Sequence, residues 1–225
     1  VNNPIAVSYR NAEILANDKD ETFAGHIIHF ESGGGSVDAI AWITDAMCQC
    51  TKPIVGYIED YCCSAALYIS SYCQYVYSAK ASAKVGSVGV MMEFEGYKAN
   101  SESADGTRHI RAYASQSTDK NAPYEVALNE MNIEILQKEI LNPLAEKFMA
   151  DMKANRPNCK DEHLHGATFT ADKVVGVYLD EIGDFNSAIA KVFELSKINA
   201  NIATQSANQS NTKKQANTNK MDINE

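Results

Sequence analysis

Short apolar runs, separated by glycine-rich or polar segments, dominate the first half of the chain. Runs at 25–30, 54–58 and 75–78 have the length and the β-branched or aromatic content of buried strands. Apolar residues at helical spacing fill the segment between the first two runs, and small residues at 62–66 open a second helix. Strands that alternate with helices indicate an α/β protein with a mostly parallel sheet flanked by helices.

The second half of the chain combines polar loops with longer apolar stripes. Residues 86–91 lead into a further strand, and polar loops at 94–108 and 114–123 flank another predicted strand at 109–113. Apolar residues from Leu128 onward predict a long helical region, which the pair Asn142-Pro143 interrupts. The segment 166–194 predicts a helix, an extended stretch and a closing helix. Residues 10–22 are polar and predict a surface helix or loop.

The composition changes near residue 198. The last segment is rich in Asn, Gln, Thr, Ala and Lys and has few large apolar residues. Such a segment buries too little surface to offset its ordering entropy. We therefore expect one folded domain over 1–197 and a disordered polar tail over 198–225.

The net charge and the hydropathy of the chain limit the classes of partner and the location that we expect for it. The formal net charge of −9 argues against nucleic acid or an anionic membrane surface, since both reward clustered Lys and Arg. No stretch approaches the roughly 20 apolar residues that span a bilayer, and no secretory signal opens the chain. We therefore expect a cytoplasmic protein. The chain begins at Val1, which is compatible with a fragment whose N-terminal strand or membrane anchor has been removed.

Cysteine and histidine spacing does not indicate a metal site. The six cysteines lack the paired spacing of zinc ligands. His163 and His165 have no second ligand pair and are expected in a solvated loop. A chain of this length with a real core does not need a disulfide framework, so the cysteines are interpreted as reduced and mostly buried.

Two turns contain residues that could take part in catalysis. The segments 32–36 and 62–66 each follow a strand and precede a helix, which places them at the carboxyl edge of a parallel sheet, where ligands bind. Ser64, at the start of the second helix, is positioned to attack a carbonyl group. The backbone N–H groups of Ala65, Gly34 and Gly35 could together bind the resulting oxyanion.

A serine nucleophile needs a base, and the sequence has no histidine between Ser64 and His109. A lysine with a lowered pKa is the alternative. The candidates are Lys80, Lys84, Lys98 and Lys120. Cys63 is a rival nucleophile, but it falls one position before the start of the helix.

Four ordered motifs resemble peptidase family S49, the signal peptide peptidase A and phage capsid-assembly protease group. Residues 32–37 (SGGGSV) resemble the family's oxyanion turn, and residues 61–68 (YCCSAALY) resemble its nucleophile turn. Residues 86–92 (GSVGVMM) look most like the phage members, and 166–183 is similar to the closing motif. Gly33 replaces the usual proline, and Ala65-Ala66 replaces Gly-Gly.

The resemblance implies a ClpP/crotonase-like fold and a serine endopeptidase with a Ser–Lys dyad. Lys120 is the only lysine in the loop where the family carries its base, and Ser87 would orient its ammonium group. Family members form rings in which a neighbour can supply the lysine. The resemblance implies no metal and no organic cofactor.

Several biological roles are compatible with this resemblance. The paired methionines and the polar tail favour a phage prohead or capsid-maturation protease, with scaffold or capsid proteins as partners. A signal peptide peptidase A-like enzyme with its anchor missing is the alternative. An inactive oligomeric scaffold, or an acyl-CoA enzyme on the same fold, would keep the oxyanion turns without using Ser64 as a nucleophile.

Overall fold

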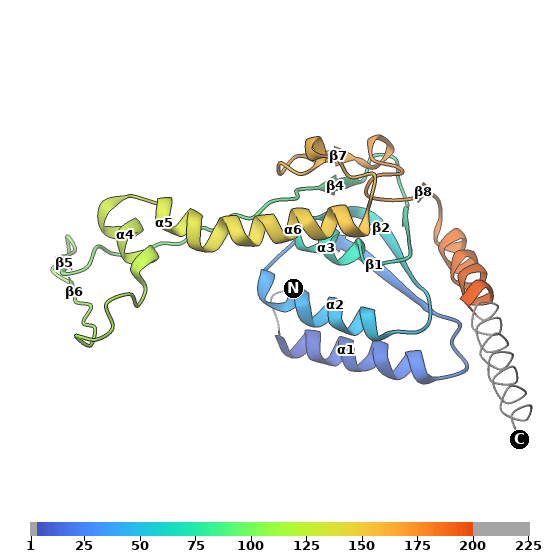
Figure 1. The fold of residues 1–225 in the computed structure, drawn as a ribbon, viewed down its shortest axis with the longest axis horizontal. Helices are drawn as coiled ribbons and strands as arrows, with labels where there is room; N and C mark the ends of the chain where they lie inside the picture. Colours follow the sequence, from blue (N-terminus) through green and yellow to red (C-terminus); the bar gives the residue numbers. More distant parts are fainter. Residues whose placement is uncertain (1–3, 200–225) are drawn as a thin grey trace, which may run out of the picture.

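A six-stranded, mostly parallel sheet organises the computed structural model, which describes residues 4–199 (Figure 1). Strand order is β7-β4-β2-β3-β8, and β1 pairs with the other side of β2. All pairings are parallel except that between β4 and β7. The strands are β1 (His26–Ser32), β2 (Ile54–Cys63), β3 (Tyr75–Ser78), β4 (Lys84–Gly86), β7 (Thr168–Thr170) and β8 (Glu181–Ile182). The predicted parallel sheet is therefore confirmed.

Helices cover both faces of this sheet. On one face, α2 (Ile40–Gln49), α3 (Ala65–Ser70) and α6 (Asn142–Asn155) pack with the sheet around a large core that includes Ile58, Leu67 and Met152. On the other face, the closing helix over residues 185–199 buries Ala188 and Val192 against Val55, Tyr57 and Tyr77. The first helix, α1 (Pro4–Lys19), packs beside α2. Short 3-10 turns lie at Val37–Ala39, Asp161–His163 and Ala171–Lys173.

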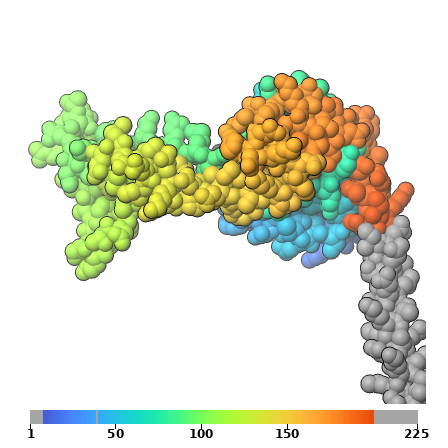
Figure 2. All heavy atoms as spheres, turned by 45° about the horizontal axis from the view of Figure 1, so that its top comes forward, coloured from blue at the N-terminus to red at the C-terminus, as the bar shows by residue number. Residues whose placement is uncertain are grey.

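An arm projects from this body (Figures 1 and 2). It contains the two-stranded ribbon β5 (Ser101–Glu102) and β6 (Arg108–His109), followed by α4 (Ala122–Glu130) and α5 (Glu134–Leu136). A π-helical segment, Gln137–Leu141, joins α5 to α6. Contacts within the arm hold it together: the rings of Tyr97 and His109 stack with centroids 3.6 Å apart, and Arg111 pairs with Glu125 at 2.9 Å.

Four sequence predictions about these elements were wrong. The helix expected at the start of 166–194 is instead the strand β7 followed by the 3-10 turn Ala171–Lys173. The strand expected at 109–113 ends at His109, and the chain after Gly86 is not a strand. The long helix is broken at Met131, whose φ of 54° is left-handed, rather than at Asn142-Pro143. Pro143 is tolerated because it lies in the first turn of α6, directly after the π segment.

The predicted tail lies largely outside the described residues. Residues 198–199 form the end of the closing helix, and 200–225 are not described.

Candidate active site

Ser64 occupies the junction between β2 and α3. Its backbone has φ 53° and ψ −125°, an unusual conformation for a residue with a side chain. Two hydrogen bonds fix this conformation: the Ser64 N–H donates to the Gly86 carbonyl at 2.9 Å, and the Ser64 carbonyl accepts from the Tyr68 N–H at 3.0 Å. The sharp turn projects the hydroxyl out of the sheet edge, in the manner of an activated nucleophile.

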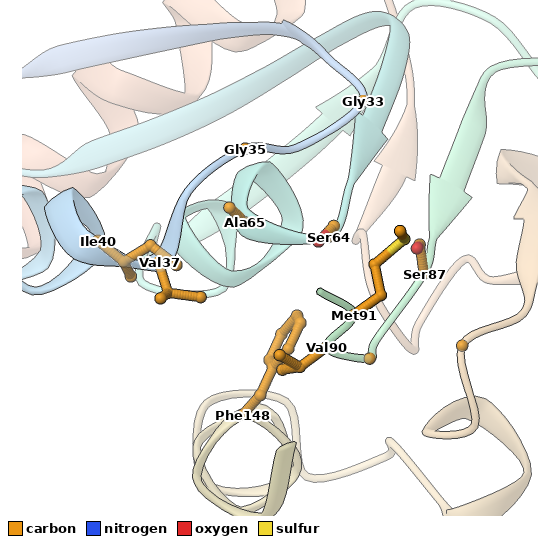
Figure 3. Close-up of a pocket in the computed structure, with 12 residues that line it drawn as sticks. Gly33, Gly35, Val37, Ile40, Ser64, Ala65, Ser87, Val90, Met91 and Phe148 are labelled. Carbon is orange, nitrogen blue, oxygen red and sulfur yellow. The ribbon is translucent and has the colours of Figure 1, made fainter. Parts of the chain in front are cut away.

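The glycine turn after β1 lies directly against Ser64 (Figure 3). Gly34 has φ +123°, and a Cβ placed on it would lie 2.7 Å from Ser64 Cβ and 3.2 Å from Ser64 Oγ. Both the dihedral angle and this separation exclude a side chain. The structure therefore brings together the two turns that the sequence singled out.

The backbone amides of Gly33, Gly35 and Ala65, which all line the cleft beside Ser64, have no hydrogen-bond partner in the described part of the chain. The Ala65 N–H is free because Ala65 is the first residue of α3. The Gly34 N–H, by contrast, donates to Ser32 Oγ at 3.2 Å. Of the predicted oxyanion donors, Gly35 and Ala65 therefore have free N–H groups in this conformation, whereas the N–H of Gly34 is already hydrogen-bonded within the turn.

Ser64 opens into a cleft of about 470 Å³. Opposite the two turns, the cleft is walled by Val90, Met91 and Phe148, and Ser87 and Gly166 also line it (Figure 3). The sequence reasoning missed this apolar wall, because Phe148 belongs to a helix whose stripe predicts only core packing. None of the described residues that line the cleft carries a titratable side chain.

Ser87 lines the cleft, which is compatible with the role that the sequence predicts for it, orienting the ammonium group of Lys120. Its φ is 59°, and its N–H donates to the Ala167 carbonyl at 2.7 Å. This bond ties the segment after β4 to β7.

Lys120 is exposed in the projecting arm, within the turn that precedes α4. Its N–H donates to the Ser117 carbonyl at 3.3 Å. The next residue, Asn121, donates from Nδ2 to the Tyr113 hydroxyl at 3.2 Å, and that hydroxyl donates to Glu125 at 2.8 Å. The lysine is therefore carried on an ordered loop, but that loop does not line the Ser64 cleft of its own chain.

The other candidates are placed differently. Lys80 pairs with Asp60 at 2.8 Å, a contact that raises the pKa of Lys80, and Lys98 lies in the arm. Cys63 is buried, its Sγ donates to the Lys84 carbonyl at 3.4 Å, and burial raises its pKa. Cys63 therefore points away from the cleft that Ser64 faces.

One group of side chains among the described residues has the composition of a metal site: Asp18, His26 and Cys50. The Asp18 carboxylate, however, accepts backbone N–H bonds from Thr51 at 2.9 Å and Lys52 at 3.0 Å. Burial opposes ionisation, but these bonds prevail and lower the pKa of Asp18 to about 2. Burial raises the pKa of Cys50 to about 11. The cluster is thus explained by its role in joining α1, β1 and α2.

No described helix has both the length and the apolar character needed to cross a membrane.

Comparison with known proteins gives a family match and a fold match. The family model described as Peptidase family S49 matches residues 46–199. Among solved structures, the chain is similar to the 1510-N membrane-bound stomatin-specific protease. A serine-to-alanine mutant of that protease aligns at 12% identity and TM-score 0.52, covering 84% of this chain and 78% of that one.

A lysine-to-alanine mutant of the same protease, in complex with a substrate peptide, aligns at 12% identity and TM-score 0.51, covering 84% of this chain and 74% of that one. An enoyl-CoA hydrotase/isomerase family protein from Silicibacter pomeroyi aligns at 12% identity and TM-score 0.49, covering 88% and 72%. The comparison with curated proteins gave no match.

Proposed function

The chain belongs to peptidase family S49, has a ClpP/crotonase-like fold and is a serine peptidase, and from this premise we propose that Ser64 is its nucleophile and Lys120 its base. The observation that carries the proposal is the contact between Ser64 and the glycine turn, which only a glycine at position 34 allows. The free amides of Gly35 and Ala65 belong to residues that line the same cleft as the Ser64 hydroxyl.

The proposed reaction is acyl transfer to Ser64. Ser64 Oγ attacks the carbonyl carbon of a peptide bond while the neutral Lys120 amine accepts the hydroxyl proton. The N–H groups of Gly35 and Ala65 stabilise the oxyanion of the tetrahedral intermediate. Lys120 then returns the proton to the leaving amine, and water releases the acyl group by the reverse sequence. Ser87 would accept a hydrogen bond from the ammonium group and orient it.

We further propose that Lys120 reaches Ser64 from a neighbouring copy in an oligomeric ring. The cleft has no titratable side chain of its own, and the loop that carries Lys120 projects with the arm (Figure 1). The arm also exposes large apolar side chains: Ile110 is 74% exposed and Met131 is 88% exposed. Large apolar side chains left this exposed are the kind that another subunit covers in an assembly.

Mixing two inactive variants tests the shared site. Ser64→Ala and Lys120→Ala are each expected to abolish cleavage of a fluorogenic peptide without unfolding the protein. Co-assembled in equal amounts, they should regain about a quarter of the wild-type rate, because a quarter of the interfaces then combine an intact serine with an intact lysine. Lys98→Ala is the matched control in the arm and should stay active.

The outcomes separate the alternatives. Recovery only in the mixture supports sharing, whereas no recovery places the lysine in the same chain as the serine. Cleavage by pure Ser64→Ala would overturn the nucleophile assignment. If the wild-type assembly failed to react with a fluorophosphonate, the chain would be an inactive scaffold.

For the biological role we propose capsid maturation in a phage prohead. Two features of the sequence support this role: the paired residues Met91-Met92 and the polar C-terminal segment. The test offers the enzyme a phage scaffold protein and a set of signal peptides. Preferential cleavage of the scaffold is expected, and preferential cleavage of the signal peptides would instead assign a signal peptide peptidase role.

A further inference from the structure

A second hollow, which we call the side pocket, opens from the Ser64 cleft. It has a volume of about 270 Å³ and shares four lining residues with the cleft: Val37, Ile40, Val90 and Phe148. Val37 and Ile40 lie on one side of the shared opening, and Val90 and Phe148 lie on the other (Figure 3). A substrate side chain that leaves the cleft between them therefore enters the side pocket.

The side pocket runs along the helices that begin at the cleft. Its walls come from α2, from α3 with the turn that follows it, and from α6. On α2, Ile40 lines the opening, and Asp45 follows by five positions, which is a rise of about 7.5 Å along the helix. Only a long side chain therefore reaches from the cleft to Asp45.

The character of the walls changes along the side pocket. Near the cleft the walls are apolar and include Leu144 and Phe148. Farther along the helices the walls carry the polar groups of Asp45, Tyr72 and Lys147. A side chain that fits this pocket has a long apolar stem and a polar or charged end.

The charged groups leave the far end of the side pocket acidic. The Lys147 ammonium pairs with the Asp151 carboxylate at 2.6 Å, and this hydrogen bond raises the pKa of Lys147. Asp45 accepts a hydrogen bond from Gln49 only at its backbone carbonyl, and its carboxylate has no partner within the part of the chain that the structure describes. The charge of Lys147 is therefore compensated and that of Asp45 is not, so a cation is attracted here and a carboxylate is repelled.

We propose that the side pocket selects a long basic side chain, lysine or arginine, on the residue that supplies the carbonyl group to Ser64. The methylene groups lie against the apolar walls, and the charged end reaches the Asp45 carboxylate and the Tyr72 hydroxyl oxygen. Asp45 is thus a specificity-determining residue. This inference rests on the proposed function, because it takes the Ser64 cleft as the place of cleavage.

The test compares three fluorogenic peptides that differ only in the residue before the cleaved bond: lysine, norleucine or glutamate. Norleucine keeps an unbranched apolar stem and lacks the charge. We expect kcat/KM to be about fivefold higher for the lysine peptide than for the norleucine peptide, which is the effect of one solvated ion pair, since Asp45 is exposed. The glutamate peptide should be cleaved most slowly.

Substitutions at position 45 assign the preference to its carboxylate. Asp45→Asn should remove the advantage of the lysine peptide and leave cleavage of the norleucine peptide unchanged. Asp45→Lys should reverse the order of the lysine and glutamate peptides. Glu146→Gln is the matched control, because it removes an acidic charge from an exposed position of α6 outside the side pocket, and it should keep the preference for lysine.

Peptide binding separates this inference from the proposed function. In the Ser64→Ala protein, fluorescence anisotropy should show about fivefold tighter binding of the lysine peptide than of the norleucine peptide, and adding Asp45→Asn should abolish the difference. Equal affinity for the two peptides, or a lysine preference that survives Asp45→Asn, would overturn the inference and leave the catalytic roles intact. If the wild type bound the lysine peptide preferentially but cleaved none of the three, the selectivity of the side pocket would be supported and the proposed function would fail.

Discussion

Gly34→Ala is the sharpest perturbation of the oxyanion turn. The added Cβ would lie 2.7 Å from Ser64 Cβ and 3.1 Å from the Cys63 carbonyl oxygen, and φ +123° is unfavourable for any L side chain. A strained backbone of this kind costs about 1–3 kcal/mol. The turn is expected to relieve that strain by moving away from Ser64.

Displacement of the turn should lower kcat/KM more strongly than it lowers the free energy of unfolding. If the Gly35 donor no longer reaches the oxyanion, kcat/KM should fall about 10²–10³-fold, as for the loss of one oxyanion donor. The assay is steady-state cleavage of a fluorogenic peptide, with urea unfolding of the same sample. Gly33→Ala is the matched control, because a Cβ on Gly33 meets nothing within 4 Å.

The comparison of the two alanine variants tests whether Ser64 constrains position 34. Gly33→Ala should be at least about tenfold more active than Gly34→Ala. If both variants were equally active and equally stable, Gly34 would not be constrained by Ser64, and the geometric argument for the site would fail.

Three further predictions concern the arm and the core. Glu125→Gln weakens the ion pair that anchors the Lys120 loop, so it should lower kcat about tenfold while the melting temperature stays unchanged. Glu130→Gln, at an exposed position of the same helix, is the control and should leave kcat unchanged. Arg156→Leu removes the buried partner of Asp180, 3.0 Å away, and should cost about 3 kcal/mol in urea unfolding. Because the pKa of Asp18 is lowered from 3.8 to about 2, its carboxylate adds to the free energy of unfolding above pH 3.8, and this contribution should be lost as the pH falls toward 2. The free energy of unfolding of Asp18→Asn should lack this pH dependence.

Local patterns were enough to predict the parallel sheet and the two turns that meet at Ser64. The runs at 25–30, 54–58 and 75–78 became β1, β2 and β3 because each is apolar and bounded by turn residues. β2 extends five residues further, to Cys63, through the polar pair Glu59-Asp60. Pairing with β1 and β4 holds that extension, which no local propensity indicates.

The arm could not be predicted, because tertiary contacts determine it. The break at Met131 depends on a left-handed backbone that nothing in the residue type favours. The ion pair of Arg111 with Glu125 and the stacking of Tyr97 on His109 join the segment predicted as a strand at 109–113 to residues distant from it in sequence. Lys120 was therefore a candidate base only through family resemblance, and the structure shows that its loop lies in the arm and does not line the Ser64 cleft.

The separation of the arm from the body has a consequence for control of proteolysis. Under the shared-site proposal, a newly made monomer holds a nucleophile without a base and is inert toward the proteins around it. Cleavage then begins only where copies become concentrated enough to assemble. Dilution itself would then keep the newly made protein inactive.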